Sequence, residues 1–169
     1  PPATLAFVAA VAVHEVLSDF VGEQALRLKW PNDIMAAHAK LSGMLLERVG
    51  DAIIIGIGIN ITSAPDLPDR LTTCLHALGA ISCDAASLLE LIAARFADHL
   101  HRWRTYGTEP LINAWLVRAH IPGTPLVAHL PDGESDEGRF ETLDADGALI
   151  LRLADGGRRA IHAGDVFTL

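Results

Sequence analysis

The residues with the clearest chemical potential lie between positions 29 and 60, where basic and amide side chains occur beside glycines. Strand alternation in the run DAIIIGIGIN places isoleucines on one face and Gly56, Gly58 and Asn60 on the other. Glycine weakens a strand, so paired glycines on one face need a reason, and close approach of a ligand is one. A bulge, or a helix packed tightly on the sheet, is the alternative reason.

A lysine lies where the chain enters the preceding strand, at the edge of this glycine-lined surface. The ammonium group of Lys40 is a compact charge with three rotatable donors, so it is suited to a phosphate group. The alternative is a solvated lysine at a strand edge. Lys29 is the second basic candidate, and we rank it below Lys40.

A polar pair, Asn32 and Asp33, follows Pro31. Both residue types are common in turns, so a simple turn is one interpretation. The other is a polar corner at the rim of a nucleotide site, where Asp33 would hold Mg²⁺ through water. The amide of Asn60 offers a donor and an acceptor side by side, which suits the edge of an adenine base.

Three adjacent strands are expected to position these residues, within LRLKWPND, AKLSGMLLER and DAIIIGIGIN, with a short loop between the first two. Apolar spacing predicts a helix over residues 3–20, with His14 at its boundary or surface. A long helix capped by Asp84 is predicted to run to about Tyr106, and a further helix is predicted over residues 108–118. Residues 66–81 are expected to form a loop with one short helix around Leu75.

The character of the chain changes at about residue 122. Short β-like runs alternate there with the turn sequences PDGES, DADG and ADGG, and the last run is RRAIHAGDVFTL. Turn signals every eight to ten residues predict a small all-β barrel. We therefore expect two domains, residues 1–121 and residues 122–169.

Composition excludes several classes of protein. Half of the 169 residues are hydrophobic and a fifth are charged, as in ordinary soluble globular proteins, and no apolar run reaches the 18 or so residues that cross a membrane. The two cysteines, Cys74 and Cys83, form no CxxC pair, which suits a reducing cytoplasm. A net charge of -8 without a basic block makes nucleic acid an unexpected partner.

Three motifs occur in a specific order: KWPND at 29–33, KLSGMLLE at 40–47 and GIGIN at 56–60. Together they resemble the catalytic domain of biotin protein ligases. The similarity continues in weaker form to the C-terminus, where residues 122–169 resemble the SH3-like domain of that family, including its Gly164-Asp165-Val166 ending. The resemblance implies an α+β fold, in which a mixed-sheet catalytic domain with helices on one face precedes a small SH3-like β-barrel.

The same resemblance implies an ATP-dependent ligase. Biotin is activated by Mg²⁺ and ATP as biotinyl-5'-AMP and is then transferred to a lysine of the biotin carboxyl carrier protein of acetyl-CoA carboxylase; a homodimer is a further expected partner. No protein nucleophile is needed, and Lys40 is the expected catalytic residue. Residues 61–68 match the family's loop that covers the adenylate. The implied biotin-binding residues are Lys40, Gly43, Gly56, Gly58 and Ile59, and the implied ATP-binding residues are Lys29, Asn32, Asp33 and Asn60, with Asp33 also binding Mg²⁺.

One departure from the family pattern bears on activity. The glycine/arginine loop of GRGRxGR type, which lies upstream in the family, does not occur in this sequence, and the chain begins without Met. We therefore expect that residues 1–169 alone make no detectable biotinyl-AMP and expose an unpaired sheet edge open to association. The alternatives are a lipoate or octanoyl ligase, a non-catalytic biotin- or nucleotide-binding protein, and an α/β domain with no ligand.

Overall fold

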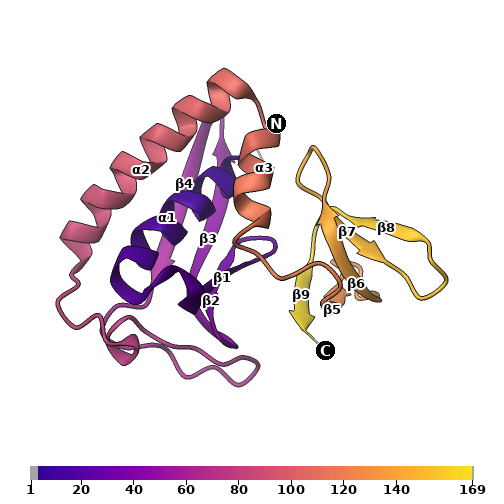
Figure 1. The fold of residues 1–169 in the computed structure, drawn as a ribbon, viewed down its shortest axis with the longest axis horizontal. Coiled ribbons are helices and arrows are strands. Elements are labelled where there is room, and N and C mark those ends of the chain that lie inside the picture. The colour runs from indigo at the N-terminus through magenta and orange to yellow at the C-terminus, as the bar shows by residue number, and fades with distance from the viewer. Residues whose placement is uncertain (1–3, 169) are drawn as a thin grey trace.

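The computed structural model describes residues 4–168, which form two antiparallel sheets with three α-helices gathered on one of them (Figure 1). The first part of the chain forms α1 (Leu5–Val21), β1 (Leu26–Lys29), β2 (Asp33–Ala36), β3 (Ala39–Val49), β4 (Ala52–Ile59), α2 (Ala85–Tyr106) and α3 (Glu109–Leu116). Two single-turn 3-10 helices, η2 (Glu23–Ala25) and η3 (His76–Leu78), interrupt the connections. The short helix expected around Leu75 is therefore present.

The larger sheet is an antiparallel meander in the order β1-β2-β3-β4. Each of its strands pairs antiparallel with the next, and parallel pairing among the described residues is confined to isolated bridges at Leu28–Ala119 and Lys40–Thr72. The parallel component of the expected mixed sheet is thus limited to these bridges. Strand β4 lies at the edge of the sheet in the part of the chain that is described.

The short loop that was expected after KWPND is wrong, whereas the turn is present. Residues 30–32 form a turn that includes Asn32, and Asp33 is then the first residue of β2, which pairs with β1 on one side and with β3 on the other. A second turn, at residues 37 and 38, joins β2 to β3, and Ala37 in it has a positive φ of 51°. A four-residue strand with two partners needs little intrinsic propensity, because its hydrogen bonds come from neighbours that the local pattern does not reveal.

The helical layer covers one face of this sheet, with α1 lying between the sheet and α2 (Figure 1). The expectation for His14 was wrong: it is only 1% exposed and lies among the buried residues of α1. Burial, reinforced by the charge of Arg118, lowers the pKa of His14 to about 4. The expected cap of α2 is confirmed, because the Asp84 carboxylate accepts hydrogen bonds from the N–H groups of Ala86 and Ser87.

The C-terminal part forms a five-stranded antiparallel sheet in the order β8-β7-β6-β5-β9. Its strands are β5 (Pro125–His129), β6 (Ser135–Leu143), β7 (Leu149–Arg152), β8 (Arg158–Ile161) and β9 (Asp165–Thr168). The last predicted run is divided into β8 and β9, which lie at opposite edges of the sheet. Gly164, with a φ of 146°, lies in the connection between them, and a side chain would not fit there because an added Cβ would collide with the His129 carbonyl oxygen.

The two sheets contact one another through the connection between β6 and β7. The indole N–H of Trp30 donates a buried hydrogen bond of 3.0 Å to the carbonyl oxygen of Gly147. The ring of Phe7 packs so closely on Gly147 that an added Cβ would lie 2.3 Å from it. The domain boundary expected at residues 121 and 122 falls between α3 and β5, and it stays a prediction.

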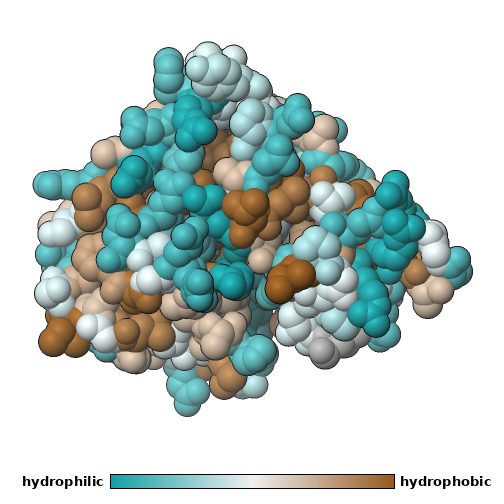
Figure 2. All heavy atoms as spheres, viewed as in Figure 1, coloured by the Kyte–Doolittle hydropathy of each residue, from teal (hydrophilic) through white to brown (hydrophobic). Residues whose placement is uncertain are grey.

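The surface of the helical layer carries both hydrophilic and apolar side chains (Figure 2). Hydrophilic side chains cover much of its upper part in Figure 2, with apolar groups between them. No helix in residues 4–168 is both long and apolar enough to span a membrane.

Candidate functional site

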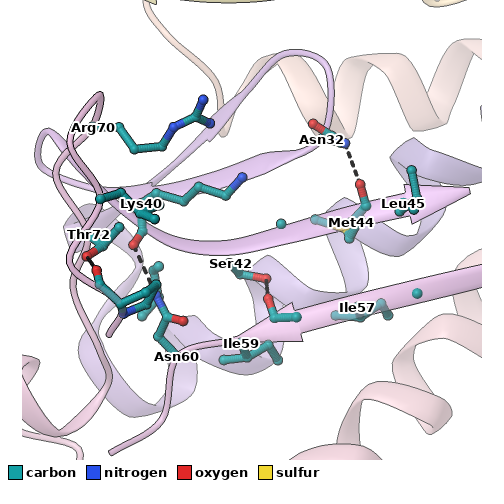
Figure 3. A pocket seen from close by; sticks show the side chains of 16 residues that line it. Asn32, Lys40, Ser42, Met44, Leu45, Ile57, Ile59, Asn60, Arg70 and Thr72 are labelled. Atoms are coloured by element: carbon teal, nitrogen blue, oxygen red, sulfur yellow. Dashed lines mark hydrogen bonds between the residues drawn. The ribbon is translucent and has the colours of Figure 1, made fainter. Parts of the chain in front are cut away.

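A cavity of about 730 Å³ opens on the glycine-bearing face of β3 and β4 (Figure 3). Its floor is formed by the two strands and one side by the segment that follows β4. The sequence-predicted residues that line it are Asn32, Lys40, Gly43, Gly56, Gly58, Ile59 and Asn60. Lys29 and Asp33 do not line the cavity but lie behind Lys40.

The register of the hairpin aligns glycines across the floor. Gly43 of β3 pairs with Gly58 of β4, and Leu45 pairs with Gly56, without a bulge between these two strands. A Cβ added at Gly56 would lie 3.7 Å from its nearest neighbour, and one at Gly58 would lie 3.8 Å away. Neither a bulge nor tight packing within the described residues therefore requires glycine at these two positions, and approach of a ligand stays the predicted reason.

The opposite face of β4 is apolar, as strand alternation predicted. Ile55, Ile57 and Ile59 are partly buried against the core, while Ile57 and Ile59 also border a small apolar cavity beside α2. The side chain of Ile59 packs towards the core, so a ligand on the glycine face would meet chiefly its backbone. The assignment of Ile59 to biotin binding stays a prediction, and it concerns the backbone of this residue.

Both lysines of the chain converge on one buried carboxylate. The ammonium group of Lys40 lies 2.6 Å from Oδ1 of Asp33, and that of Lys29 lies 3.8 Å from Oδ2. Asp33 is 4% exposed and is placed by the pairing of β2 with β1 and β3. The two ammonium groups share this carboxylate, and the further carboxylate of Asp165 also acts on Lys29, so positive and negative groups are concentrated in a partly desolvated setting.

Lys29 contacts residues of both sheets. Its ammonium group lies 4.8 Å from the ring centroid of Phe167 in β9. Burial lowers the pKa of Lys29, against the opposing effect of Asp33 and Asp165. Its side chain is 11% exposed, so Lys29 is placed to shape the charge around Asp33, and direct contact with ATP stays a prediction.

Gly43 has a specific steric role beside Lys40. A Cβ at this position would lie 2.9 Å from both Cε and Nζ of the lysine and 3.2 Å from Oδ1 of Asp33. The lysine side chain therefore crosses directly over Gly43, which explains why a glycine follows Lys40 at this spacing.

The two asparagines are tied to neighbouring backbone. The side-chain amide of Asn32 donates to the carbonyl oxygen of Met44, whose N–H in turn donates to the carbonyl oxygen of Asn32 (3.0 Å). The amide of Asn60 donates to the carbonyl oxygen of Thr73 (2.9 Å), which holds the segment after β4 against the cavity, and it also lies 3.5 Å from the carbonyl oxygen of Lys40, the contact drawn in Figure 3. Each amide therefore has a structural contact beside the ATP-binding role that the sequence predicted.

The geometry argues against Asp33 as a Mg²⁺ ligand. Both of its oxygens face ammonium groups, and a divalent cation would be repelled by them. In residues 4–168, no group of three or more His, Cys, Asp or Glu side chains is arranged to hold a metal ion. We assign no metal to this carboxylate.

Sequence reasoning missed several cavity residues. Arg70 and Thr72 lie in an irregular segment ten or more residues beyond β4, without periodicity to mark them. Leu45 follows the predicted Gly43 by one alternation on the same face, so its position was available from the strand pattern. The further residues missed are Leu41, Ser42, Met44 and Ile57, whereas Pro65 and Leu67, which also line the cavity, belong to the loop predicted at residues 61–68.

Family comparisons cover nearly the whole chain. The model of the biotin/lipoate A/B protein ligase family matches residues 2–117, and the model of the biotin protein ligase C-terminal domain matches residues 127–169. These two matches fall on the two parts of the fold that carry the larger and the smaller sheet.

Several characterised relatives are similar to this chain. The biotin–[acetyl-CoA-carboxylase] ligase of Paracoccus denitrificans is 39% identical over 176 residues, covering 98% of this chain and 72% of the relative. The enzyme of the same name from Mycobacterium tuberculosis is 32% identical, covering 84% of this chain and 53% of the relative. The bifunctional ligase/repressor BirA of Bacillus subtilis is 31% identical over 96% of this chain and 52% of its own length. The chain thus spans about half of the latter two relatives.

Solved structures share the fold. The apo biotin protein ligase of Aquifex aeolicus superposes with a TM-score of 0.85 at 22% identity, covering 99% of this chain and 75% of that chain. The structure of the Aquifex enzyme in complex with biotin and ATP gives the same TM-score, with 71% of that chain covered. The ordered motifs, the fold and these matches agree, and the chain belongs to the biotin protein ligase family.

Proposed function

We propose that the protein is an ATP-dependent biotin ligase, which forms biotinyl-5'-AMP and transfers the biotinyl group to a lysine of a biotin carboxyl carrier protein. The observation that carries this proposal is the combination of an open glycine floor with the Lys40–Asp33 pair at its end. A flat ring system can lie on bare backbone, while the lysine faces the charged end of the substrate. The similarity to two enzymes named biotin–[acetyl-CoA-carboxylase] ligase supports acetyl-CoA carboxylase as the source of the carrier.

The first chemical step needs positive charge from the protein and no protein nucleophile, because the biotin carboxylate is itself the attacking group. A carboxylate oxygen of biotin attacks the α-phosphorus of ATP, and the bond from this phosphorus to the bridging oxygen breaks, releasing pyrophosphate. Negative charge gathers on the non-bridging oxygens in the transition state, so a fixed cation accelerates the step. Mg²⁺ bound to the triphosphate would neutralise part of the remaining charge.

We assign Lys40 as the cation for this step, and its geometry supports the assignment. Its ammonium group is oriented by a 2.6 Å contact with Asp33, and its stem crosses Gly43 within the cavity wall. An oriented cation needs little reorganisation as charge develops, which is the main requirement for electrostatic catalysis. The ammonium groups of Lys40 and Lys29 repel one another, and the Asp33 carboxylate that both contact keeps them close together.

The second step transfers the activated group. The amine of the carrier lysine attacks the carbonyl carbon of the mixed anhydride, and the bond to the phosphate oxygen breaks, releasing AMP. A cavity that is open to solvent on one side admits such a macromolecular acceptor. We further propose a homodimer, supported by the family resemblance, and a cytoplasmic location, supported by the two cysteines without a CxxC pair.

Substitution of Lys40 tests the proposal. Lys40→Ala in the full-length protein should lower the single-turnover rate of pyrophosphate release by about 10²–10³-fold, because one donor to developing charge is lost. Biotin affinity, measured by calorimetry, should change far less. Arg48→Ala is the matched control, since it removes an exposed cation from the other end of β3. Unchanged pyrophosphate release in the Lys40 variant would contradict the assignment.

A further inference from the structure

A second cation lines the cavity beside Lys40, from a segment with no recognisable motif. Arg70 lies between β4 and η3, and its side chain lines the cavity together with Lys40. In Figure 3 the two side chains extend in the same direction, with Arg70 above Lys40 in the view. The side chain of Arg70 is 28% exposed, which equals the value for Lys40.

The backbone fixes Arg70 next to Lys40. The N–H of Lys40 donates to the carbonyl oxygen of Leu71 (2.8 Å), and the N–H of Thr73 donates to the carbonyl oxygen of Lys40 (3.0 Å). These bonds form the parallel bridge between Lys40 and Thr72. The 2.9 Å hydrogen bond from Asn60 to Thr73 strengthens the attachment. Arg70 therefore directly precedes an anchored stretch of backbone.

The electrostatic setting favours an anionic ligand. Arg70 pairs with Asp69 through two hydrogen bonds of 2.8 and 3.0 Å, which raise the pKa of the guanidinium. Asp69 is itself exposed, so this pair contributes little stability and can be exchanged for a better partner. Arg70 also adds to the positive charge that Lys29 experiences, and Asp33 and Asp165 act on both groups, so the three cations share one region with these two carboxylates.

We propose that Arg70 binds the triphosphate of ATP through the phosphates that leave as pyrophosphate. The inference rests on the proposed function and adds a residue to it. Lys40 crosses Gly43 of the floor and serves the reacting α-phosphate, whereas Arg70 reaches the cavity from the segment that follows β4. A planar guanidinium can form two parallel hydrogen bonds with phosphate oxygens, a geometry that the ammonium group of a lysine lacks.

Binding measurements with substituted full-length protein test this inference. Arg70→Gln should weaken binding of a non-hydrolysable ATP analogue and raise the inhibition constant of pyrophosphate, each by about 10- to 100-fold, as expected for lost hydrogen bonds to a charged group. Biotin affinity should stay within about twofold, since no biotin contact is lost. Arg48→Gln, which removes an exposed arginine remote from the cavity, is the matched control.

A second substitution separates ligand binding from a structural role of the Arg70–Asp69 pair. Asp69→Asn should leave ATP affinity unchanged or raise it, because the guanidinium loses a competing anion. A purely structural pair predicts equal losses in both variants, and that result would overturn the inference. So would an Arg70→Gln variant that binds ATP and pyrophosphate like the Arg48 control. A wild-type protein that bound neither biotin nor ATP would instead refute the proposed function, and the inference with it.

Discussion

Substitution of Gly56 by valine separates the ligand and packing explanations for the glycine floor. The Cβ built at Gly56 lies 3.7 Å from the Leu45 carbonyl oxygen, an ordinary contact distance, and nothing else is close. The folded state should therefore accept the side chain. Glycine within a strand costs roughly 0.5–1 kcal/mol relative to alanine, so the variant should gain up to about 1 kcal/mol of stability.

The ligand-bound state should respond in the opposite direction. A ligand present at about 100 times its Kd stabilises the folded state by about 2.7 kcal/mol. For a chain of this size, that corresponds to a rise in Tm of roughly 5–10 °C. Valine at position 56 would project two methyl groups into the cavity, where the biotin rings are expected, so this rise should disappear.

Thermal unfolding of the full-length protein with and without biotin measures both effects. Ala52→Val is the matched control, because it adds a side chain on the same face of β4 outside the cavity. The control should keep the full rise in Tm. A Gly56 variant with an undiminished rise would refute the position assigned to biotin. A variant that unfolded well below the wild type without ligand would refute the packing argument drawn from the 3.7 Å distance.

Three other outcomes are expected from the contacts described. Asn60→Ala should weaken ATP binding and largely spare biotin, because its amide holds the loop after β4; an equal loss of biotin affinity in calorimetry would contradict this assignment. Acid should destabilise the protein through His14, since its pKa of about 4 in the folded state lies below the ordinary 6.5. The folding free energy that depends on neutral His14 is fully present above pH 6.5 and is lost as the pH falls towards 4, with a total of about 3 kcal/mol. His14→Gln should flatten the dependence of urea-unfolding free energy on pH in that interval, whereas substitution of the exposed His162 should not, and equal curves would count against the burial argument. Trp30→Phe should cost about 1–3 kcal/mol in the same unfolding assay, because the buried Gly147 carbonyl loses its donor; a change below about 0.5 kcal/mol would show that this bond contributes little.

Local patterns in the sequence determined much of the framework. The alternation along residues 53–61 was sufficient to assign opposite faces of β4, because side-chain direction in a strand depends only on the parity of position. The long helix was predicted with its Asp84 cap for a similar reason, since a cap bonds to N–H groups two and three residues away. The ordered motifs identified the family, which the comparisons confirm.

Tertiary structure alone decided how the charges combine. Lys29 and Lys40 come from different strands and reach Asp33 only because a third strand, β2, is paired between them. No local sequence pattern predicted this strand. Arg70 reaches the cavity through a bridge to β3 that joins segments some thirty residues apart. His14 shows the converse: its polar side chain predicted exposure, yet packing of α1 between the sheet and α2 buries it. Strand parity and helix caps act over a few residues, whereas ion pairs and burial depend on which distant segments pack together, and that is set by the complete fold.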